Sequence, residues 1–556
     1  MPKSKVMGYS HTELFQVVSN AVPDRNAIVQ RNLHFTYAEL EEVSRRIANL
    51  LLENDIGIHQ QRSDLANWES GQDHVGLFLH NGWEYLAATL GANAARAVPF
   101  NVNYRYVATE LAYLLNDAKC AVIIYHATFA PTLEAVLPLL NQQPLLFQVP
   151  DDSGVPPLPG SRNFHSAIAA SHDGSLSTTP SGDDLYILYT GGTTGMPKGT
   201  LWRQADIYEA ALRVGARTQA GGESALGILS AAATVRPGKR IMPLAPFMHG
   251  AAQWGALGAL FSGGTVVIPG EVTRLDPFDV WRTVEDQQVE IMTLVGDPFA
   301  RPLVDELEAH PSDTSSLVHI TSGGAALSAE VKARLRALLP HVAIADTVGS
   351  TEAGPMIVNT TKPGSVDTRP IGFFLAQEGT GVVDDDRHHM LEAGHSGVGW
   401  LARSGNIPLG YLGDADKTAA TFPLVDGVRV TVSGDRARLN SDGLIQLLGR
   451  EAITINSGGE KIFAEEVEQA IIRHPAIDDV MVVGRPSNRW GQEVVAVIQC
   501  RPGLTAADDD IIRSTHDVLA DYKRPKAIVR VTQIVRSPAG KADYAWASSV
   551  AIGAIE

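Results

Sequence analysis

The chain has 556 residues, which is too long for one ordinary hydrophobic core and predicts two to four domains. Its 45 basic and 62 acidic residues give a net charge of −17, which disfavours a protein that coats nucleic acid or binds a membrane through a basic surface. The 44% apolar content excludes a disordered chain, and two distant cysteines, Cys120 and Cys500, exclude a disulfide framework.

The N-terminal residues lack the apolar core of a signal peptide, and with so few cysteines we expect a cytoplasmic protein. The nearest approach to a membrane span is the uncharged stretch at residues 250–270, which contains six glycines. The pair Gly263 and Gly264 separates a helix-like part from the strand-like residues 265–268. We therefore predict a buried helix, a turn and a buried strand here, and no transmembrane segment.

Most of the chain alternates between short apolar strands and helices. Residues 75–79 predict a strand and residues 85–95 a helix, and the same order follows at 121–125 and 132–140. Such alternation favours parallel sheets with helices on both faces, which bind ligands at the carboxyl ends of their strands. The fold class is therefore a large α/β N-terminal domain with two doubly wound sheets.

The pattern of predicted strands and helices changes twice towards the C-terminus. Short strands with Gly and Asp turns at residues 355–448 predict a small β-barrel-like subdomain. Helices at 464–474 and 508–522, with strands at 480–483 and 494–499, then predict a separate α+β domain. We accordingly expect an N-terminal domain at residues 1–450, which binds ATP and the acyl substrate, and a mobile C-terminal domain at 452–556.

The densest group of chemically informative residues follows a predicted strand at residues 185–188. Its members are glycines, threonines and one lysine: Thr190, Gly191, Gly192, Thr193, Thr194, Gly195 and Lys198. Glycines let backbone N–H groups approach a polyphosphate, threonine hydroxyls add donors, and Lys198 adds a positive charge. The order is not that of a Walker A loop. A plain Gly/Thr-rich turn is the alternative, which this density of donors disfavours.

These residues resemble the phosphate loop of the adenylate-forming superfamily, which contains acyl-CoA synthetases, luciferases and peptide-synthetase adenylation domains. Other motifs similar to those of the family follow in the expected order over nearly the whole chain: Ser322 to Ala325, Gly349 to Glu352, Ser433 to Asp435, Gly449 and Arg450, Asn456 to Lys461, and Gly540 and Lys541. Together with Trp202 to Gln204 and Pro246 to Gly250, they look most like bacterial acyl-CoA synthetases for long-chain or sterol-side-chain acids.

The resemblance implies a role for each motif. It implies that Thr351 contacts phosphate, that Glu352 holds Mg²⁺, and that Lys541 bridges the substrate carboxylate and the α-phosphate. Thr351, Glu352, Lys198 and Lys541 are thus the expected catalytic residues. The nucleotide and CoA contacts that it implies lie on the adenine side (Gly323, Gly324, Ala325, Asp346, Val348, Gly349), at the ribose (Asp435, Arg450) and at the pantetheine arm (Ser457, Gly458, Gly459).

The acyl pocket of the family lies after the segment 246–250, which implies His249, Gln253, Trp254 and Gly323 as substrate contacts. His249 either orients the carboxylate or packs as a pocket wall, and Trp254 suits the core as well as the lining.

Three places depart from the usual family pattern, and one of them is the lead-in to Lys541, which is reduced to Val535 to Pro538. Val348 stands where an aromatic residue usually stacks on adenine, so the base would be held by apolar packing and by Asp346. Ala452 stands near the usual Asp or Lys hinge, which still permits rotation. The pair His388 and His389 lies in a charged turn and lacks further spaced ligands, so a solvated loop is expected there rather than a metal site.

The expected function is therefore an ATP-dependent carboxylic acid–CoA ligase for a hydrophobic acid, with ATP, Mg²⁺ and coenzyme A as cofactors. Two alternatives stay open: transfer of the acyl group to a carrier-protein pantetheine, and an adenylate-binding protein that does not turn over. The chain ends at Glu556 with no appended carrier domain, which favours free CoA. The expected partners are small molecules, without nucleic acid, and the family also allows a homodimer.

Overall fold

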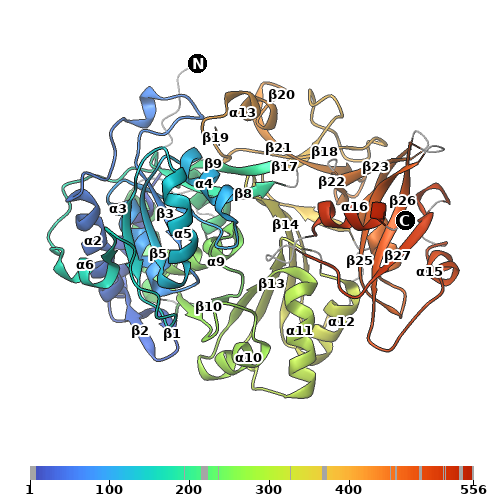
Figure 1. The fold of residues 1–556 in the computed structure, drawn as a ribbon, viewed down its shortest axis with the longest axis horizontal. Helices are drawn as coiled ribbons and strands as arrows, with labels where there is room; N and C mark the ends of the chain where they lie inside the picture. Colours follow the sequence, from blue (N-terminus) through green and yellow to red (C-terminus); the bar gives the residue numbers. More distant parts are fainter. Residues whose placement is uncertain are drawn as a thin grey trace.

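The computed structural model describes residues 8–192, 195–213, 223–235, 237–325, 327–365, 372–450, 453–457, 460–487, 491–516, 519, 521–536 and 542–553. Its strands form three sheets, of eight, fourteen and five strands. In Figure 1 the first sheet lies in the blue to cyan part, the second runs through the centre, and the third forms the red C-terminal part.

The eight-stranded sheet is parallel in its middle and ends in an antiparallel hairpin. Its strands, in spatial order, are β19 (Gly410–Tyr411), β9 (Gly195–Arg203), β8 (Leu185–Gly192), β4 (Val98–Asn101), β3 (His74–Phe78), β5 (Cys120–His126), β6 (Leu145–Val149) and β7 (Arg162–Asn163).

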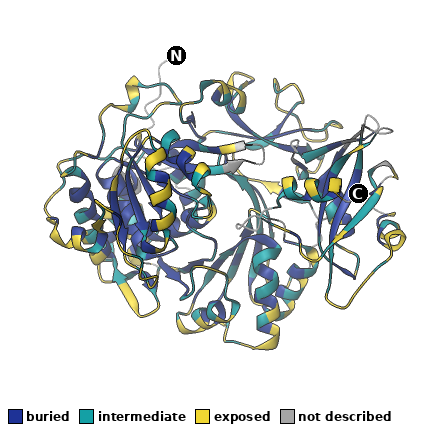
Figure 2. Ribbon diagram, in the orientation of Figure 1, coloured by how far each residue is buried: buried dark blue, intermediate teal, exposed yellow. Residues whose placement is uncertain are grey.

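Helices cover both faces of this sheet, as the alternating sequence predicts. Val75 and Leu77 of β3 pack in one hydrophobic cluster with α2 (Tyr37–Leu52) and α3 (Trp83–Ala94). Phe78 packs in a second cluster with α4 (Ala108–Asp117) and α5 (Ala130–Val136). All five residues of β3 are buried, which is typical of a parallel strand covered on both sides. In Figure 2 the strands are dark blue, and the yellow, exposed residues lie on the outer helix faces and loops.

The fourteen-stranded sheet changes character along its length: its strands are parallel from β11 to β14 and antiparallel from β14 to β17. In spatial order its strands are β17 (Thr380–Val383), β18 (Gly399–Ser404), β21 (Val428–Leu439), β22 (Ile445–Arg450), β16 (Phe373–Ala376), β15 (Gly354–Thr361), β14 (Ala343–Ser350), β13 (His319–Gly323), β12 (Ile291–Leu294), β10 (Arg240–Pro243), β11 (Thr265–Ile268), β1 (Asn26–Gln30) and β2 (Leu33–Thr36), with β20 (Leu424–Val425) beside β21.

Helix α6 (Phe164–Ala170) packs on β6, β7 and α2 at the edge of the eight-stranded sheet. The other helices of this region follow along the chain as α1 (His11–Ala21), α7 (Gln204–Ile207), a π-helix (Tyr208–Leu212), α8 (Glu223–Val235), α9 (Gly250–Leu260), α10 (Pro277–Asp286), α11 (Gly296–Ala309), α12 (Ala329–Leu338) and α13 (Ala415–Thr421). Capping boxes start α1 at Ser10 and α2 at Thr36, where a hydroxyl and a glutamate satisfy the first free N–H groups.

These observations confirm the α/β fold class and correct one detail. The strands at 373–450 extend the central sheet, and among the described residues they do not close into a barrel. The stretch at 250–270 forms α9, a turn and the buried strand β11, as predicted. No helix within the described ranges has the length and apolarity needed to cross a membrane.

The C-terminal sheet has its own helices and its own core. Its strands are β24 (Glu460–Phe463), β23 (Thr454–Ser457), β26 (Gly491–Cys500), β25 (Ile477–Ser487) and β27 (Ala527–Val531), and its helices are α14 (Ala464–Ile471), α15 (Asp508–Ser514) and α16 (Tyr544–Gly553). Both helices predicted here end earlier than expected. Pro475 follows the first of them, and its ring disfavours a helical conformation at His474.

Candidate functional site

The candidate site lies where two β-hairpins, one from each large sheet, approach each other. The hairpin of β8 and β9 carries the Gly/Thr-rich segment, and the hairpin of β14 and β15 carries Thr351 and Glu352 in its turn. Trp202 of β9 joins them, because its indole Nε1–H donates a hydrogen bond of 2.9 Å to the carbonyl of Thr351. Residues 149 positions apart in the sequence thus share one site.

The first hairpin presents the expected phosphate-binding residues at its tip. Thr190 pairs with Lys198, and Gly192 pairs with Gly195, so Gly191 lies in the same strand end. Thr193 and Thr194, which were expected to contact phosphate, lie outside the described residues. The turn of a hairpin leaves backbone N–H groups without strand partners, and such groups suit a polyphosphate.

Asn101 fixes the end of β8. Its side-chain amide donates to the carbonyls of Tyr189, at 2.8 Å, and Met248, at 2.7 Å, and its oxygen accepts from the Tyr189 N–H at 2.8 Å. Asn101 is 3% exposed, so these three bonds are shielded from water. It therefore ties the start of the phosphate segment to the residue before His249, a role that the sequence did not reveal.

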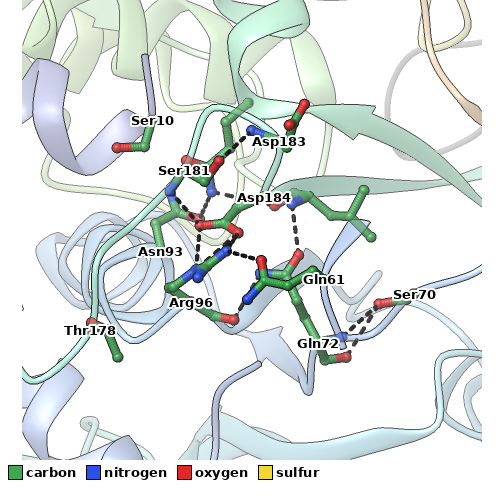
Figure 3. A network of polar contacts seen from close by, with 12 residues as sticks. Ser10, Gln61, Ser70, Gln72, Asn93, Arg96, Thr178, Ser181, Asp183 and Asp184 are labelled. Atoms are coloured by element: carbon green, nitrogen blue, oxygen red, sulfur yellow. Dashed lines mark hydrogen bonds and ion pairs between the residues drawn. The ribbon is translucent and has the colours of Figure 1, made fainter. Parts of the chain in front are cut away.

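A buried polar network holds the other end of β8 (Figure 3). Asp184 accepts a hydrogen bond of 2.7 Å from the Arg96 guanidinium and one of 2.9 Å from the Ser181 N–H. Gln72 accepts from the N–H of Leu185, the first residue of the strand, at 2.9 Å. Burial raises the pKa of Asp184, and the hydrogen bond from Arg96 opposes that rise. Both ends of β8 are thus held by side chains.

The second hairpin needs glycine at Gly349 because a Cβ there would lie 2.4 Å from the carbonyl oxygen of Gly354. Beyond the turn, the buried Arg403 donates to the carbonyls of Ala353, at 2.7 Å, and Pro355, at 2.8 Å. These contacts fix the backbone on either side of Gly354, and with it the turn that carries Thr351 and Glu352.

Tyr411 links the charged residues of the two hairpins. Its hydroxyl donates a hydrogen bond of 2.9 Å to Glu352 Oε1, and the ammonium of Lys198 lies 5.7 Å from the centroid of its ring. Burial, followed by the nearby Glu352 carboxylate, raises the pKa of Tyr411. Tyr411 was absent from the predicted site residues, and no local sequence signal marks it, because its partner lies 59 positions away.

The adenine-side residues lie at the carboxyl ends of two neighbouring strands. Ser322 pairs with Asp346 and Gly323 pairs with Thr347, so these predicted contacts share one edge of the central sheet. Gly324 has a φ of +84°, which favours glycine. Val348 and Gly349 follow in β14, and the half-buried Val348 packs on the cluster around Met356 and Phe374. Ala325 packs against the cluster between the large sheets.

The two predicted ribose contacts are also brought together. Asp435 of β21 and Arg450 of β22 are Cα partners across two antiparallel strands. Asp435 is 5% exposed, and the Ser433 hydroxyl donates to its carboxylate at 3.2 Å. The side chain of Arg450 lies outside the described part of the chain.

Three of the four predicted acyl contacts lie at the start of α9, and the fourth, Gly323, ends β13. His249 is the residue before this helix, and Trp254 is half-buried against the cluster between the sheets. The amide of Gln253 is engaged by core partners: its NH₂ donates to the Tyr85 hydroxyl and the Phe247 carbonyl, and its oxygen accepts from the Tyr186 hydroxyl. These three partners favour a structural role for Gln253, and its contact with an acid stays a prediction.

Of the C-terminal motifs, the described part contains Ser457, which is 7% exposed and pairs with Glu460 and Gly491. Gly458, Gly459 and Lys541 lie outside the described residues. On either side of Lys541, Arg536 and Ala542 form a β-bridge, and the Arg536 guanidinium donates to the Asp479 carboxylate at 2.7 and 2.5 Å.

A cavity of about 250 Å³ lies near the carboxyl ends of β10 and β11. Apolar side chains and three guanidinium groups from distant segments line it, including Leu244, Phe299, Arg105, Arg274 and Arg536. The lining also contains the carboxylates of Glu271 and Asp276, which lie 3.9 and 4.0 Å from the Arg274 guanidinium.

A metal would have few protein ligands at this site. Within the described ranges, no three side chains of His, Cys, Asp or Glu gather as they would around a metal ion, at His388 and His389 or elsewhere. Glu352 is the carboxylate between the two hairpins. One carboxylate suits Mg²⁺, which usually keeps its waters and binds through one or two carboxylates and the phosphates of a nucleotide.

Comparison with known proteins identifies the family. The model of the AMP-binding enzyme family matches residues 15–412, and the model of its C-terminal domain matches residues 466–541. The chain is 48% identical to the medium-chain acyl-CoA ligase Mig of Mycobacterium avium, over 97% of each chain. It is 36% identical to 3-oxocholest-4-en-26-oate–CoA ligase of Rhodococcus rhodochrous, over 97% of this chain and 96% of that one.

Among solved structures, the fold matches the anthranilate CoA ligase AuaEII in complex with anthranoyl-AMP, with a TM-score of 0.80, 21% identity and full coverage of both chains. The chain therefore belongs to the AMP-binding enzyme family, with the adenylate-forming fold that its motifs predict.

Proposed function

We propose that this chain, an AMP-forming acyl-CoA synthetase, joins a hydrophobic carboxylic acid to coenzyme A with ATP as the energy source. The observation that carries the proposal is the meeting of the two hairpins at Tyr411, whose hydroxyl donates to Glu352 and whose ring lies 5.7 Å from the Lys198 ammonium. A lysine and a magnesium-binding carboxylate at one site suit the triphosphate of ATP.

The first step forms the acyl-adenylate. A carboxylate oxygen of the acid attacks the α-phosphorus of ATP, the bond to the β-phosphate bridging oxygen breaks, and pyrophosphate leaves. Lys198, Thr190 and Thr351 would bind the phosphates and balance the charge of the transition state. Mg²⁺, held by Glu352, would neutralise part of the phosphate charge when bound. Asp435 and Arg450 would hold the ribose, and Gly323, Gly324 and Asp346 the adenine.

The second step forms the thioester. The CoA thiolate attacks the acyl carbonyl carbon, AMP leaves, and the thiol proton passes to solvent or base. The cavity lined by Arg105 and Arg274 suits an anionic part of CoA, because guanidinium groups bind phosphate well. We therefore assign it to the CoA side of the reaction.

We further propose that residues 1–450 and 452–556 act as two bodies that rotate near Ala452. The separate C-terminal sheet and the positive φ of Gly449, +118°, support a pivot at this place. One orientation would bring Lys541 to the carboxylate and α-phosphate, and the other would bring Gly458 and Gly459 to the pantetheine arm.

The acid is proposed to be hydrophobic. The names of the relatives mention a medium-chain acyl-CoA ligase and a steroid acid ligase, and these two classes differ in width. The small residues of α9 and the half-buried Trp254 favour an apolar acyl channel at the start of this helix.

One assay tests the function: pyrophosphate release and thioester formation over a panel of medium-chain, long-chain and steroid acids, with and without CoA. We expect pyrophosphate and acyl-CoA in equal amounts with at least one of these acids. Pyrophosphate without thioester would favour a carrier-protein acceptor, and no pyrophosphate with any acid would refute the ligase. Lys541→Ala should abolish adenylation and spare thioester formation from supplied acyl-adenylate.

A further inference from the structure

Tyr411 occupies a position between the two groups that the proposed function needs for ATP. Its hydroxyl is 2.9 Å from Glu352 Oε1, and its ring centroid is 5.7 Å from the Lys198 ammonium. An ammonium within about 6 Å of an aromatic centroid is attracted to the ring. One side chain therefore contacts both the carboxylate and the cation.

The ring of Tyr411 is held rigidly from its own strand. Its N–H donates to the Thr418 hydroxyl at 2.9 Å, and its Cα pairs with Thr200 of β9. The ring packs on Phe422 with centroids 5.9 Å apart, and Tyr411 is 6% exposed. A hydroxyl on such a ring has a fixed place, which a solvated side chain does not have.

Glu352, by contrast, lies in the turn between β14 and β15. A glutamate side chain has three rotatable bonds and loses considerable entropy when a ligand orders it. A hydroxyl that donates to one carboxylate oxygen selects one orientation before the ligand arrives. The second carboxylate oxygen then has a defined direction.

We propose that Tyr411 is a positioning residue that pre-orders Glu352 for a divalent cation and Lys198 for the phosphates carried by that cation. The inference rests on the proposed function, because the cation would arrive with ATP. Tyr411 itself contacts neither the reacting atoms nor the phosphates. The hydroxyl acts on the carboxylate, and the ring acts on the ammonium.

The two contacts can be separated by substitution. Tyr411→Phe removes the hydroxyl and keeps the ring, so the dissociation constant of the cation should rise roughly 10- to 100-fold, as expected for one hydrogen bond to a charged group. Tyr411→Leu also removes the ring, so it should in addition raise the KM for ATP at saturating Mg²⁺. The KM for the acid should stay unchanged in Tyr411→Phe.

The main measurement is a binding titration rather than turnover. Mn²⁺ is titrated into the full-length protein with a non-hydrolysable α,β-methylene ATP analogue, and free Mn²⁺ is followed by electron paramagnetic resonance. A second measurement gives the Mg²⁺ concentration for half-maximal pyrophosphate release. Both constants should rise together in Tyr411→Phe.

Tyr125→Phe is the matched control, because Tyr125 is fully buried and its hydroxyl donates to Ser161 at 3.0 Å in another part of the eight-stranded sheet. It should leave the cation constants unchanged. The inference is overturned if Tyr411→Phe matches the wild type in both cation constants, or if the two tyrosine variants change them equally. A wild-type protein that releases no pyrophosphate would instead refute the proposed function.

Discussion

Replacing Asn101 with alanine should loosen the β8–β9 hairpin just before its turn. The side chain makes three short bonds, two to Tyr189 and one to Met248, and it is 3% exposed. Alanine removes all three bonds and leaves one N–H and two carbonyl groups of the backbone without these partners. The hairpin end and the segment before His249 would then be free to separate.

The magnitude follows from the bond count. A buried hydrogen bond contributes about 1 kcal/mol net, so three bonds predict a loss of about 3 kcal/mol in the free energy of unfolding. With a urea m-value of about 3 kcal/mol/M, the unfolding midpoint falls by about 1 M. Because Tyr189 directly precedes Thr190, we also expect kcat/KM for ATP to fall roughly tenfold, the equivalent of about 1.4 kcal/mol.

Urea unfolding, followed by tryptophan fluorescence, and steady-state kinetics measure the two effects. Asn116→Ala is the control. The side-chain amide of Asn116 also both donates and accepts a hydrogen bond, but this residue of α4 is only half-buried. Its midpoint should move by less than half as much. Above neutral pH, Asn101→Asp should lower the unfolding midpoint more than Asn101→Ala does, because a carboxylate cannot donate to the two carbonyls. An Asn101→Asp protein as stable as the alanine variant would refute the reasoning.

Three further predictions concern pH, the function of Lys541 and CoA. Burial and the nearby Glu465 carboxylate raise the pKa of Glu468 to about 8, so the folded state holds a proton that the unfolded state releases. The free energy of unfolding should therefore fall as the pH rises from about 4.5 to 8. Glu468→Gln should make the melting temperature depend less on pH over this range in a thermal-unfolding series. Asp479→Asn removes the partner of Arg536 and should slow adenylation while sparing thioester formation from supplied acyl-adenylate; equal losses in both half-reactions would contradict it. Arg105→Ala should raise the KM for CoA several-fold and leave acid-dependent ATP–pyrophosphate exchange unchanged.

Much of the fold, and the proximity of the residues expected to contact adenine, could be predicted from the sequence because the signals are local. Apolar runs and helical patterns specify the strands and helices, and the carboxyl ends of adjacent parallel strands meet at one edge. This is why Ser322 and Asp346 lie side by side although 23 other residues separate them. Once the strands form one continuous sheet, the order of the motifs along the chain is enough to bring these residues to the same edge.

The contacts that join the two sheets could not be predicted in the same way. Trp202 with Thr351 and Tyr411 with Glu352 connect different sheets, and neither pair belongs to a repeating pattern. Gln253 is the opposite case, because the sequence motif predicts a substrate contact where the structure shows hydrogen bonds within the core. A polar residue after the 246–250 motif suits a substrate pocket, yet its amide completes a hydrogen-bond network with two buried tyrosines that lie far away in the sequence.

The way the C-terminal part is attached fits the proposed rotation. Among the described residues, its two hydrophobic clusters draw only on residues after 452, so its core does not depend on the rest of the chain. Two ion pairs, Arg501 with Glu330 and Arg301 with Asp478, cross to the larger part on partly exposed side chains. Such pairs contribute about 1 kcal/mol or less each. Through these pairs the proposed orientations would differ by a few kcal/mol at most, a difference that ATP binding or pyrophosphate release would be able to reverse without unfolding either part.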